Sequence, residues 1–311
     1  KGRTSVIAAF PMYDWPQVEH STDALWSAIR DRLRAQGIAA PDRLTRGEGI
    51  WDIWERTDLL LAQTCGMPYR TKLHGRVRLV GTPDYGLPGA LPGYYYSELI
   101  VRVDEDGDLA DFLPRVLAFS GQDSQSGWAA PQNLVASMGL PPFTHTLHTG
   151  AHRESALAVA SGRADIAAID AVTWRLITTH VPELAARLRV LQHTDPTPGL
   201  PFITALAHDA GPLARAAAEA IAELSHADRA VLGRCLRPRR PGGARSARTF
   251  PDRQSTVPAL GTVSLDQLGL AQPLGEGMEL LRGEVLRTDH HQMALQPGLP
   301  NTPKVFVAQL G

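Results

Sequence analysis

The stretch "GAHRESALAVASGRADIAAIDAVTWRL", residues 150–176, combines helical and strand patterns within a single short segment. It predicts a helix over 152–161, a strand over 164–169 and a second helix over 170–179. Short apolar runs alternate with amphipathic stretches in the same way from residue 4 to about residue 233. Regular alternation of this kind indicates an α/β fold.

The alternation falls into two sets, which predict two small α/β lobes with a cleft between them. We expect the first lobe to comprise residues 1–95 and 200–236, and the second to comprise residues 96–199. The chain would cross between the lobes at 94–103 and again at 193–203. In the first lobe, one long helix is predicted to bury a stripe formed by Val18, Leu25, Trp26, Ile29 and Leu33.

The last part of the chain has a different composition. Between Arg234 and Arg253 arginine, proline and glycine dominate, and no Trp or Tyr follows Trp174. Such a stretch has little apolar surface to bury, so we expect residues 237–311 to form a poorly structured or loosely docked tail. One short helix, at about 276–287, is predicted within it.

The composition limits the partners of the protein. The 311 residues carry a formal net charge of −1, which gives no general attraction for nucleic acid or an anionic membrane surface. No apolar run approaches the roughly 18 residues of a membrane span. The two cysteines, Cys65 and Cys235, do not support a disulfide framework. Because no metal or nucleotide motif is recognisable, we expect no cofactor and no metal site. We also expect a monomer. His290 and His291 lack further ligands at a useful spacing.

A turn rich in small polar residues follows one of the predicted strands. In "FSGQDSQSGWAAPQNL", residues 119–134, the strand ends near Ser120 and a helix begins near Gly127. Free N–H groups at the start of a helix, with the hydroxyls of Ser124 and Ser126, make a potential anion site that requires no Lys or Arg. The alternative is that Asp123 or Ser124 only caps the helix.

Two other loops repeat this arrangement. Gln63 and Thr64 follow a buried strand, and Tyr13 and Asp14 follow the first strand before Pro16 begins a helix. Loops at the carboxyl ends of strands gather along one edge of an open α/β sheet. In a two-lobed protein, we expect these loops to face a common cleft.

The segments around Tyr13, Gln63 and His152, together with "SQSGWAAP" and "DPTPGLPFIT", resemble the phosphate, phosphite and phosphonate substrate-binding proteins of ABC transporters. The resemblance covers residues 4–233 and implies a type 2 periplasmic-binding-protein fold. It implies that the serine turn, here Ser124, Gln125 and Ser126, binds the phospho group, and that His152 and Tyr13 close over the ligand. Gln125 replaces the hydroxyl residue that is usual in phosphonate binders.

The remaining candidates each have a structural alternative. His152 either donates to an anion or covers a helix end, and Asp170 is an N-cap, a cleft carboxylate or both. Tyr95 either lines the cleft or packs in the hinge. Cys65 has no His or acid at a recognisable spacing, which favours a buried small residue over a nucleophile. Asp14 or Asp170 would accept a hydrogen bond from a protonated ligand or pair with an amino group.

The expected function is non-enzymatic capture of a small oxyanion between two lobes that close on a hinge, with an ABC permease as the implied partner. One alternative is an enzyme on the same scaffold, of the dehydratase or pyrimidine-precursor synthase type. Another is a ligand-sensing module without transport. The expected location is the periplasm if a leader is removed, and the cytoplasm otherwise.

Overall fold

The structure is a computed structural model that describes residues 6–232. The chain divides into two units, Lys1–Ala247 and Arg248–Gly311, and every described residue belongs to the first. The predictions for the tail 237–311, for its helix at 276–287 and for His290 and His291 lie outside the described residues.

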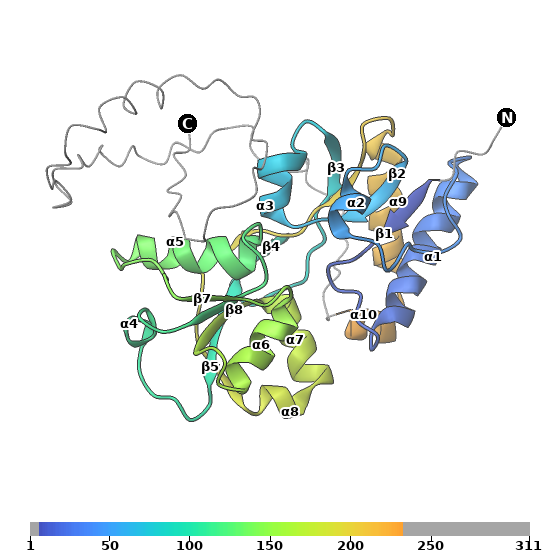
Figure 1. The fold of residues 1–311 in the computed structure, drawn as a ribbon. Helices are drawn as coiled ribbons and strands as arrows, with labels where there is room; N and C mark the ends of the chain where they lie inside the picture. The colour runs from blue at the N-terminus through green and yellow to red at the C-terminus, as the bar shows by residue number, and fades with distance from the viewer. Residues whose placement is uncertain (1–5, 233–311) are drawn as a thin grey trace, which may run out of the picture. The chain divides into compact units, whose positions relative to one another are not determined.

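The first sheet has four strands in the order β1-β2-β11-β3 and lies at the upper right of Figure 1. β2 runs parallel to β1, whereas β11 is antiparallel to both of its neighbours. The strands span Ile7–Ala9 (β1), Leu59–Gln63 (β2), Val77–Gly81 (β3) and Phe202–Ala205 (β11). The accompanying helices are α1 (Glu19–Ala35), α2 (Ile50–Trp54), α3 (Gly66–Pro68), η1 (Tyr69–Leu73), α9 (Ala210–Glu223) and α10 (His226–Val231).

The second sheet has five strands in the order β7-β6-β8-β5-β9. β6 is parallel to β7 and β8, and β5 is antiparallel to β8 and β9. The strands span Ser97–Arg102 (β5), Leu117–Phe119 (β6), Thr146–His148 (β7), Ile166–Asp170 (β8) and Leu188–His193 (β9). Around them lie α4 (Leu109–Phe112), η2 (Gln125–Ala129), α5 (Ala130–Ser137), α6 (His152–Ala160), α7 (Ala171–His180) and α8 (Pro182–Ala185).

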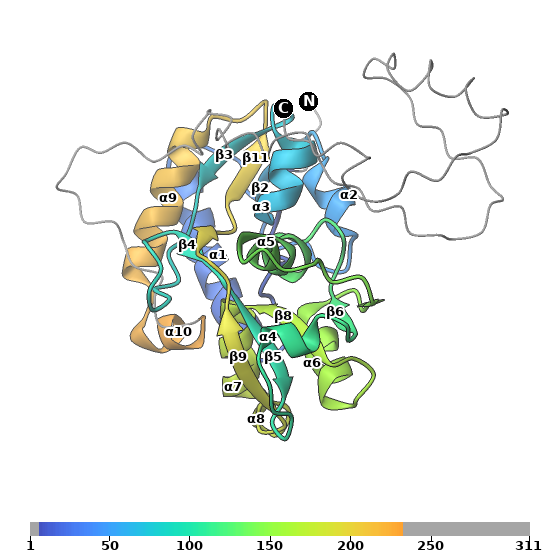
Figure 2. The same ribbon diagram turned by 90° about the vertical axis from the view of Figure 1, so that its left-hand side faces the viewer.

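The two sheets are joined by a short ribbon. β4 (Tyr94–Tyr95) pairs antiparallel with β10 (Thr197–Pro198), as Figure 2 shows between the upper and lower sheets. The two predicted crossings therefore run side by side. The mixed sheets and their helices confirm the predicted two-lobed α/β fold, whereas the residue boundaries of the lobes remain a prediction.

The single strand predicted over 94–103 is wrong in one respect, because the chain leaves the ladder at Tyr96. The Tyr96 carbonyl accepts from the N–H of Ala171 at 3.0 Å, and its ring packs against His193 with centroids 5.0 Å apart. These contacts separate β4 from β5. They also fix the start of α7 relative to the crossing.

The helix α1 buries the predicted stripe against the first sheet. Val18, which precedes the helix, and the four stripe residues within α1 are at most 5 % exposed. They pack in one cluster with Leu60 and Leu61 of β2 and with Ala216 and Ala220 of α9. Burial of these side chains supplies the main driving force that holds in place β2, which ends at Gln63, and β1, which leads into the loop of Tyr13.

The second lobe has its own core, in which Leu99 of the interior strand β5 is fully buried beside Phe112 and Val135. Leu99→Ala should lower the free energy of unfolding by about 2–5 kcal/mol, because it removes buried methyl groups and leaves a cavity. Leu91, which is 62 % exposed, provides the control. Leu91→Ala should change the free energy of unfolding by less than about 0.5 kcal/mol. Urea denaturation measures both, and equal effects of the two variants would contradict this assignment of the core.

Candidate functional site

Ser124 is the N-cap of the helical segment that begins with η2 and continues as α5. Its Oγ accepts a hydrogen bond from the N–H of Gly127 at 2.9 Å, so Ser124 caps the helix, as the alternative interpretation predicted. Its carbonyl accepts from Trp128 at 3.3 Å and from Ala129 at 3.1 Å, which widens the first turn. The hydroxyl proton of Ser124 is still available to a ligand because the cap uses the oxygen only as an acceptor.

Ser126 and His152 meet on the inner side of this turn. Ser126 Oγ lies 2.8 Å from His152 Nε2, and the Ser126 carbonyl accepts from the Ser97 hydroxyl at 2.9 Å. Ser126 comes from η2, His152 opens α6 and Ser97 opens β5. Three elements of the second lobe therefore hold the Ser126 hydroxyl in one position.

Burial favours the neutral form of the His152 ring in this arrangement. Burial lowers the pKa of His152 below its usual value of 6.5, and the nearby charge of Asp170 opposes this shift only in part. A buried imidazole resists protonation because the low-dielectric interior disfavours its charged form. His152 therefore offers a neutral ring that a bound anion could convert to the imidazolium form.

Tyr95 adds a buried hydroxyl to the same group. Its side chain is 1 % exposed, and the hydroxyl has no hydrogen-bond partner of ordinary geometry among residues 6–232. Burial, followed by the electrostatic influence of Cys65 and Asp170, raises the pKa of Tyr95 well above its usual value of 10.0. The phenol therefore keeps its proton and is available as a donor.

A buried hydrogen bond connects the two lobes at Tyr13 and Asp170. The Tyr13 hydroxyl donates to Asp170 Oδ2 at 2.8 Å, while Asp170 Oδ1 accepts from the N–H groups of Val172 at 2.7 Å and Thr173 at 3.1 Å. Burial and the charge of Asp170 raise the pKa of Tyr13, which keeps it a donor. Asp170 is thus both the N-cap of α7 and a carboxylate between the lobes, as the sequence allowed.

Gln63 and Thr64 lie at the end of β2, close to Tyr13. Gln63 Nε2 donates to the Tyr85 hydroxyl at 3.0 Å and to the Leu200 carbonyl at 3.2 Å, and the Tyr85 ring packs edge-on against Tyr13 with centroids 5.2 Å apart. A cavity of about 40 Å³, with room for about one water molecule, is bordered by Tyr13, Gln63 and Tyr85. Thr64 is fully buried.

Asp14 does not join this group. Both of its carboxylate oxygens accept from Arg46, at 2.5 Å and 3.2 Å, and Arg46 also binds Asp23 at 2.8 Å. Within the part of the chain that the structure describes, no hydrogen bond of Asp14 reaches the second lobe. The ion pair with Arg46 explains this position, since it ties Asp14 to the loop after α1.

The sequence analysis missed Arg70, whose Nη2 donates to Gln125 Oε1. Arg70 belongs to η1 and Gln125 to η2, so this bond also joins the lobes, at the place where α3 and α5 lie next to each other in Figure 2. Near it, the Trp51 indole donates to Asp123 at 3.1 Å. The sequence gives one indication that Arg70 lies near the site: it follows Gln63, a predicted site residue, by seven residues within a helical stretch.

Gly127 allows the serine turn to pack closely. A methyl group at this position would lie 2.6 Å from Ser120 Oγ, 3.1 Å from Ser124 Oγ and 3.3 Å from His152 Cε1. Any side chain would therefore push these polar groups apart. The glycine in the predicted motif is required by the close approach of three side chains.

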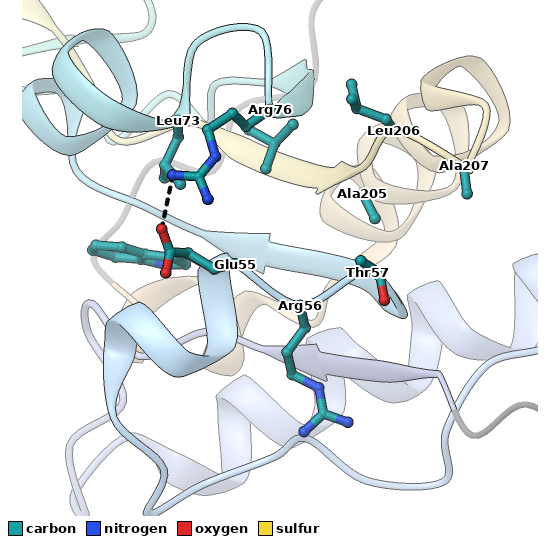
Figure 3. A pocket seen from close by; sticks show the side chains of 10 residues that line it. Glu55, Arg56, Thr57, Leu73, Arg76, Ala205, Leu206 and Ala207 are labelled. Atoms are coloured by element: carbon teal, nitrogen blue, oxygen red, sulfur yellow. Dashed lines mark ion pairs between the residues drawn. The ribbon is translucent and has the colours of Figure 1, made fainter. Parts of the chain in front are cut away.

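A separate cavity of about 280 Å³ lies elsewhere in the first lobe, and Figure 3 shows it with Arg76 and Glu55 forming an ion pair at 2.9 Å. It is lined by Trp54, Glu55, Arg56, Thr57, Leu73, Arg76, Val77, Ala205, Leu206 and Ala207. No predicted site residue contributes to it. We therefore place the candidate site at the junction of the lobes.

The donors at this junction suit a small oxyanion. Ser124 and Tyr95 offer O–H groups near the start of η2, and Ser126 offers a third when His152 Nε2 donates to its Oγ. Free backbone N–H groups at the start of η2 add a partial positive charge. The thiol of Cys65 is a poor nucleophile because burial, and to a smaller degree Asp170, raises its pKa. Across residues 6–232, no cluster of three or more His, Cys, Asp or Glu is arranged to hold a metal ion, and no helix is long and apolar enough to span a membrane.

Several solved structures are similar in fold at low sequence identity. XAC2383 from Xanthomonas citri, bound to ATP, is 16 % identical with a TM-score of 0.56, over 76 % of this chain and 91 % of that one. A binding protein component of an ABC phosphonate transporter from Pseudomonas aeruginosa is 18 % identical with a TM-score of 0.54, over 73 % and 79 %. PhnD1 from Prochlorococcus marinus, in complex with methylphosphonate, is 14 % identical with a TM-score of 0.55, over 75 % and 91 %.

Comparison with curated proteins finds no match. The family model for the phosphonate periplasmic substrate-binding protein of ABC transporters matches residues 56–235, which is more than half of the chain. That segment includes the serine turn, His152, Asp170 and Arg70. The chain therefore belongs to the family of periplasmic phosphonate substrate-binding proteins of ABC transporters.

Proposed function

We propose that this protein binds a small phosphorus oxyanion, of the phosphonate, phosphite or phosphate type, at the junction of its two lobes and delivers it to an ABC permease. The proposed location is the periplasm. The observation that carries the proposal is the group of buried neutral donors at the serine turn. Buried polar groups normally have well-formed hydrogen bonds. The Tyr95 hydroxyl lies near Ser126 and Cys65 but has no partner of ordinary geometry among the described residues, which supports a ligand at this place.

The proposed binding step needs no chemical reaction. Hydrogen bonds from Ser124, Ser126, Tyr95 and the turn would replace the hydration of the anion, and closure of the lobes would exclude water. Tyr13 and Asp170 would hold the lobes together around the ligand. The raised pKa of Cys65 argues only against an enzyme that uses this thiol as a nucleophile. We infer from the family that the protein is not an enzyme. A sensing module would use the same binding step.

Asp170 has little capacity left for a cationic group on the ligand. One oxygen accepts from Tyr13 and the other from two backbone N–H groups. An amino group on the ligand would have to compete with these three donors. We therefore infer that Asp170 positions Tyr13 and α7, and that the ligand is recognised mainly through its oxyanion.

Ser126→Ala tests the site directly. The variant removes a charge-assisted hydrogen bond to the anion, so methylphosphonate should bind about 10- to 100-fold more weakly by isothermal titration calorimetry. Ser137 provides the matched control, because it is an exposed serine of α5 whose hydroxyl bonds only to the Leu134 carbonyl. Ser137→Ala should bind like the wild type. Undiminished binding by Ser126→Ala would reduce the serine turn to a helix cap.

The affinity should also depend on pH through His152. The pKa of His152 in the free protein lies below 6.5, and a bound anion raises it by stabilising the imidazolium form. Binding then takes up a proton. Affinity is highest below the pKa of the free protein, falls as pH rises toward the pKa in the complex, and is constant above that value.

A ligand with one charge state over this range, such as methanesulfonate or a phosphonate monoester, isolates the effect, because phosphate itself titrates near neutral pH. His152→Gln should flatten the pH profile while keeping a donor. His148→Gln is the control, since His148 is an exposed histidine of β7. If the wild-type profile is flat and His152→Ala binds equally well, His152 takes no part in the site.

A further inference from the structure

Arg70 has a neutral side-chain acceptor as its partner, whereas six arginines of its lobe are paired with acids. Arg30, Arg32, Arg34, Arg46, Arg56 and Arg76 all form ion pairs with Asp or Glu. Among the described residues, no carboxylate lies within ion-pair distance of Arg70. Its guanidinium instead donates to the neutral side-chain carbonyl of Gln125. A cation with only an amide partner retains most of its capacity to bind an anion.

This guanidinium lies beside the proposed anion site. Gln125 stands between Ser124 and Ser126 and is 4 % exposed. Arg70 also lies over Gly66, where a methyl group would be 3.4 Å from Arg70 Nη1 and 4.0 Å from Gln125 Cγ. Cys65, the residue before Gly66, lies close to Tyr95 and to the backbone of Gln125. The Arg70 guanidinium therefore contacts the middle residue of the serine turn.

Arg70 itself is exposed, although its contact is with the buried Gln125. The bond to Gln125 joins η1 of the first lobe to η2 of the second, so an anion placed there would contact both lobes. A guanidinium presents a planar fork that matches a carboxylate in a bidentate manner, so a carboxylate gives it two charge-assisted bonds and an opposite charge, whereas Gln125 gives it one bond and no charge. A ligand carboxylate is thus a better acceptor for Arg70 than the Gln125 amide.

We propose that Arg70 binds a second anionic group of the ligand, and that the ligand class is a small phosphonate that also carries a carboxylate. The phosphonate group is bound by the donors of the serine turn, and the carboxylate replaces Gln125 Oε1 at Arg70. This inference rests on the proposed function, because it assumes that the first group binds at the serine turn. It assigns a role to Gln125, which holds the guanidinium in place through a neutral acceptor that the ligand replaces.

The test compares three probes by isothermal titration calorimetry: methylphosphonate, phosphonoacetate and 2-aminoethylphosphonate. The wild type should bind phosphonoacetate at least about 10-fold more tightly than methylphosphonate, and 2-aminoethylphosphonate no more tightly than methylphosphonate. Arg70→Gln should weaken phosphonoacetate about 10- to 100-fold and leave methylphosphonate within about 2-fold. Arg70→Lys keeps the charge but loses the fork, so it should recover only part of the affinity for phosphonoacetate.

Arg163→Gln provides the matched control, because Arg163 is an exposed arginine whose side chain bonds to Ser161 rather than to an acid. It should leave all three affinities unchanged. If Arg70→Gln weakens methylphosphonate and phosphonoacetate equally, or weakens neither, the inference about the second anionic group is overturned while the proposed function stands. If the wild type binds none of the probes, the proposed function fails and the inference fails with it.

Discussion

The hydrogen bond from Tyr13 to Asp170 is the contact on which the candidate site depends. It joins the loop after β1 in the first lobe to the end of β8 in the second, and both side chains are at least 90 % buried. A buried carboxylate is costly unless it is fully hydrogen-bonded. Tyr13 and two N–H groups of α7 meet this requirement together, so the start of α7 and the position of Tyr13 are fixed by one carboxylate. If the lobes separate, Asp170 loses the hydrogen bond from Tyr13.

The charge of Asp170 also shapes the chemistry around it. It favours the protonated forms of Tyr13, Tyr95 and Cys65 and partly offsets the desolvation of His152. The site therefore presents proton donors at neutral pH although its nearest ionised group is an acid. A group of neutral donors can bind an anion without a fixed cation, provided that water is excluded. Arg70 at the rim supplies positive charge where a larger ligand would extend.

The sequence predicted the order of the elements because each one carries a clear local signal. Strands such as β2 are short apolar runs, and α1 carries a continuous apolar stripe. The break at Tyr96 could not be predicted, because it arises from a contact with Ala171 and His193, which are far away in the sequence. At the site, the joint position of Ser126, His152 and Asp170 follows from loops at strand ends. The pairing of Arg70 with Gln125 and of Asp14 with Arg46 depends on side-chain geometry between separate segments, and no local pattern encodes it.

The central claim is that the fold holds a phosphorus oxyanion between its lobes, and thermal unfolding of the wild type with a panel of anions tests it most directly. Phosphate, phosphite, methylphosphonate, phosphonoacetate and sulfate are each added over a wide concentration range. The account predicts that at least one phosphorus oxyanion raises the midpoint of unfolding, and that at 100 times its dissociation constant it stabilises the fold by about 2.7 kcal/mol. Sulfate should be weaker. An unchanged midpoint with every phosphorus oxyanion would contradict the account.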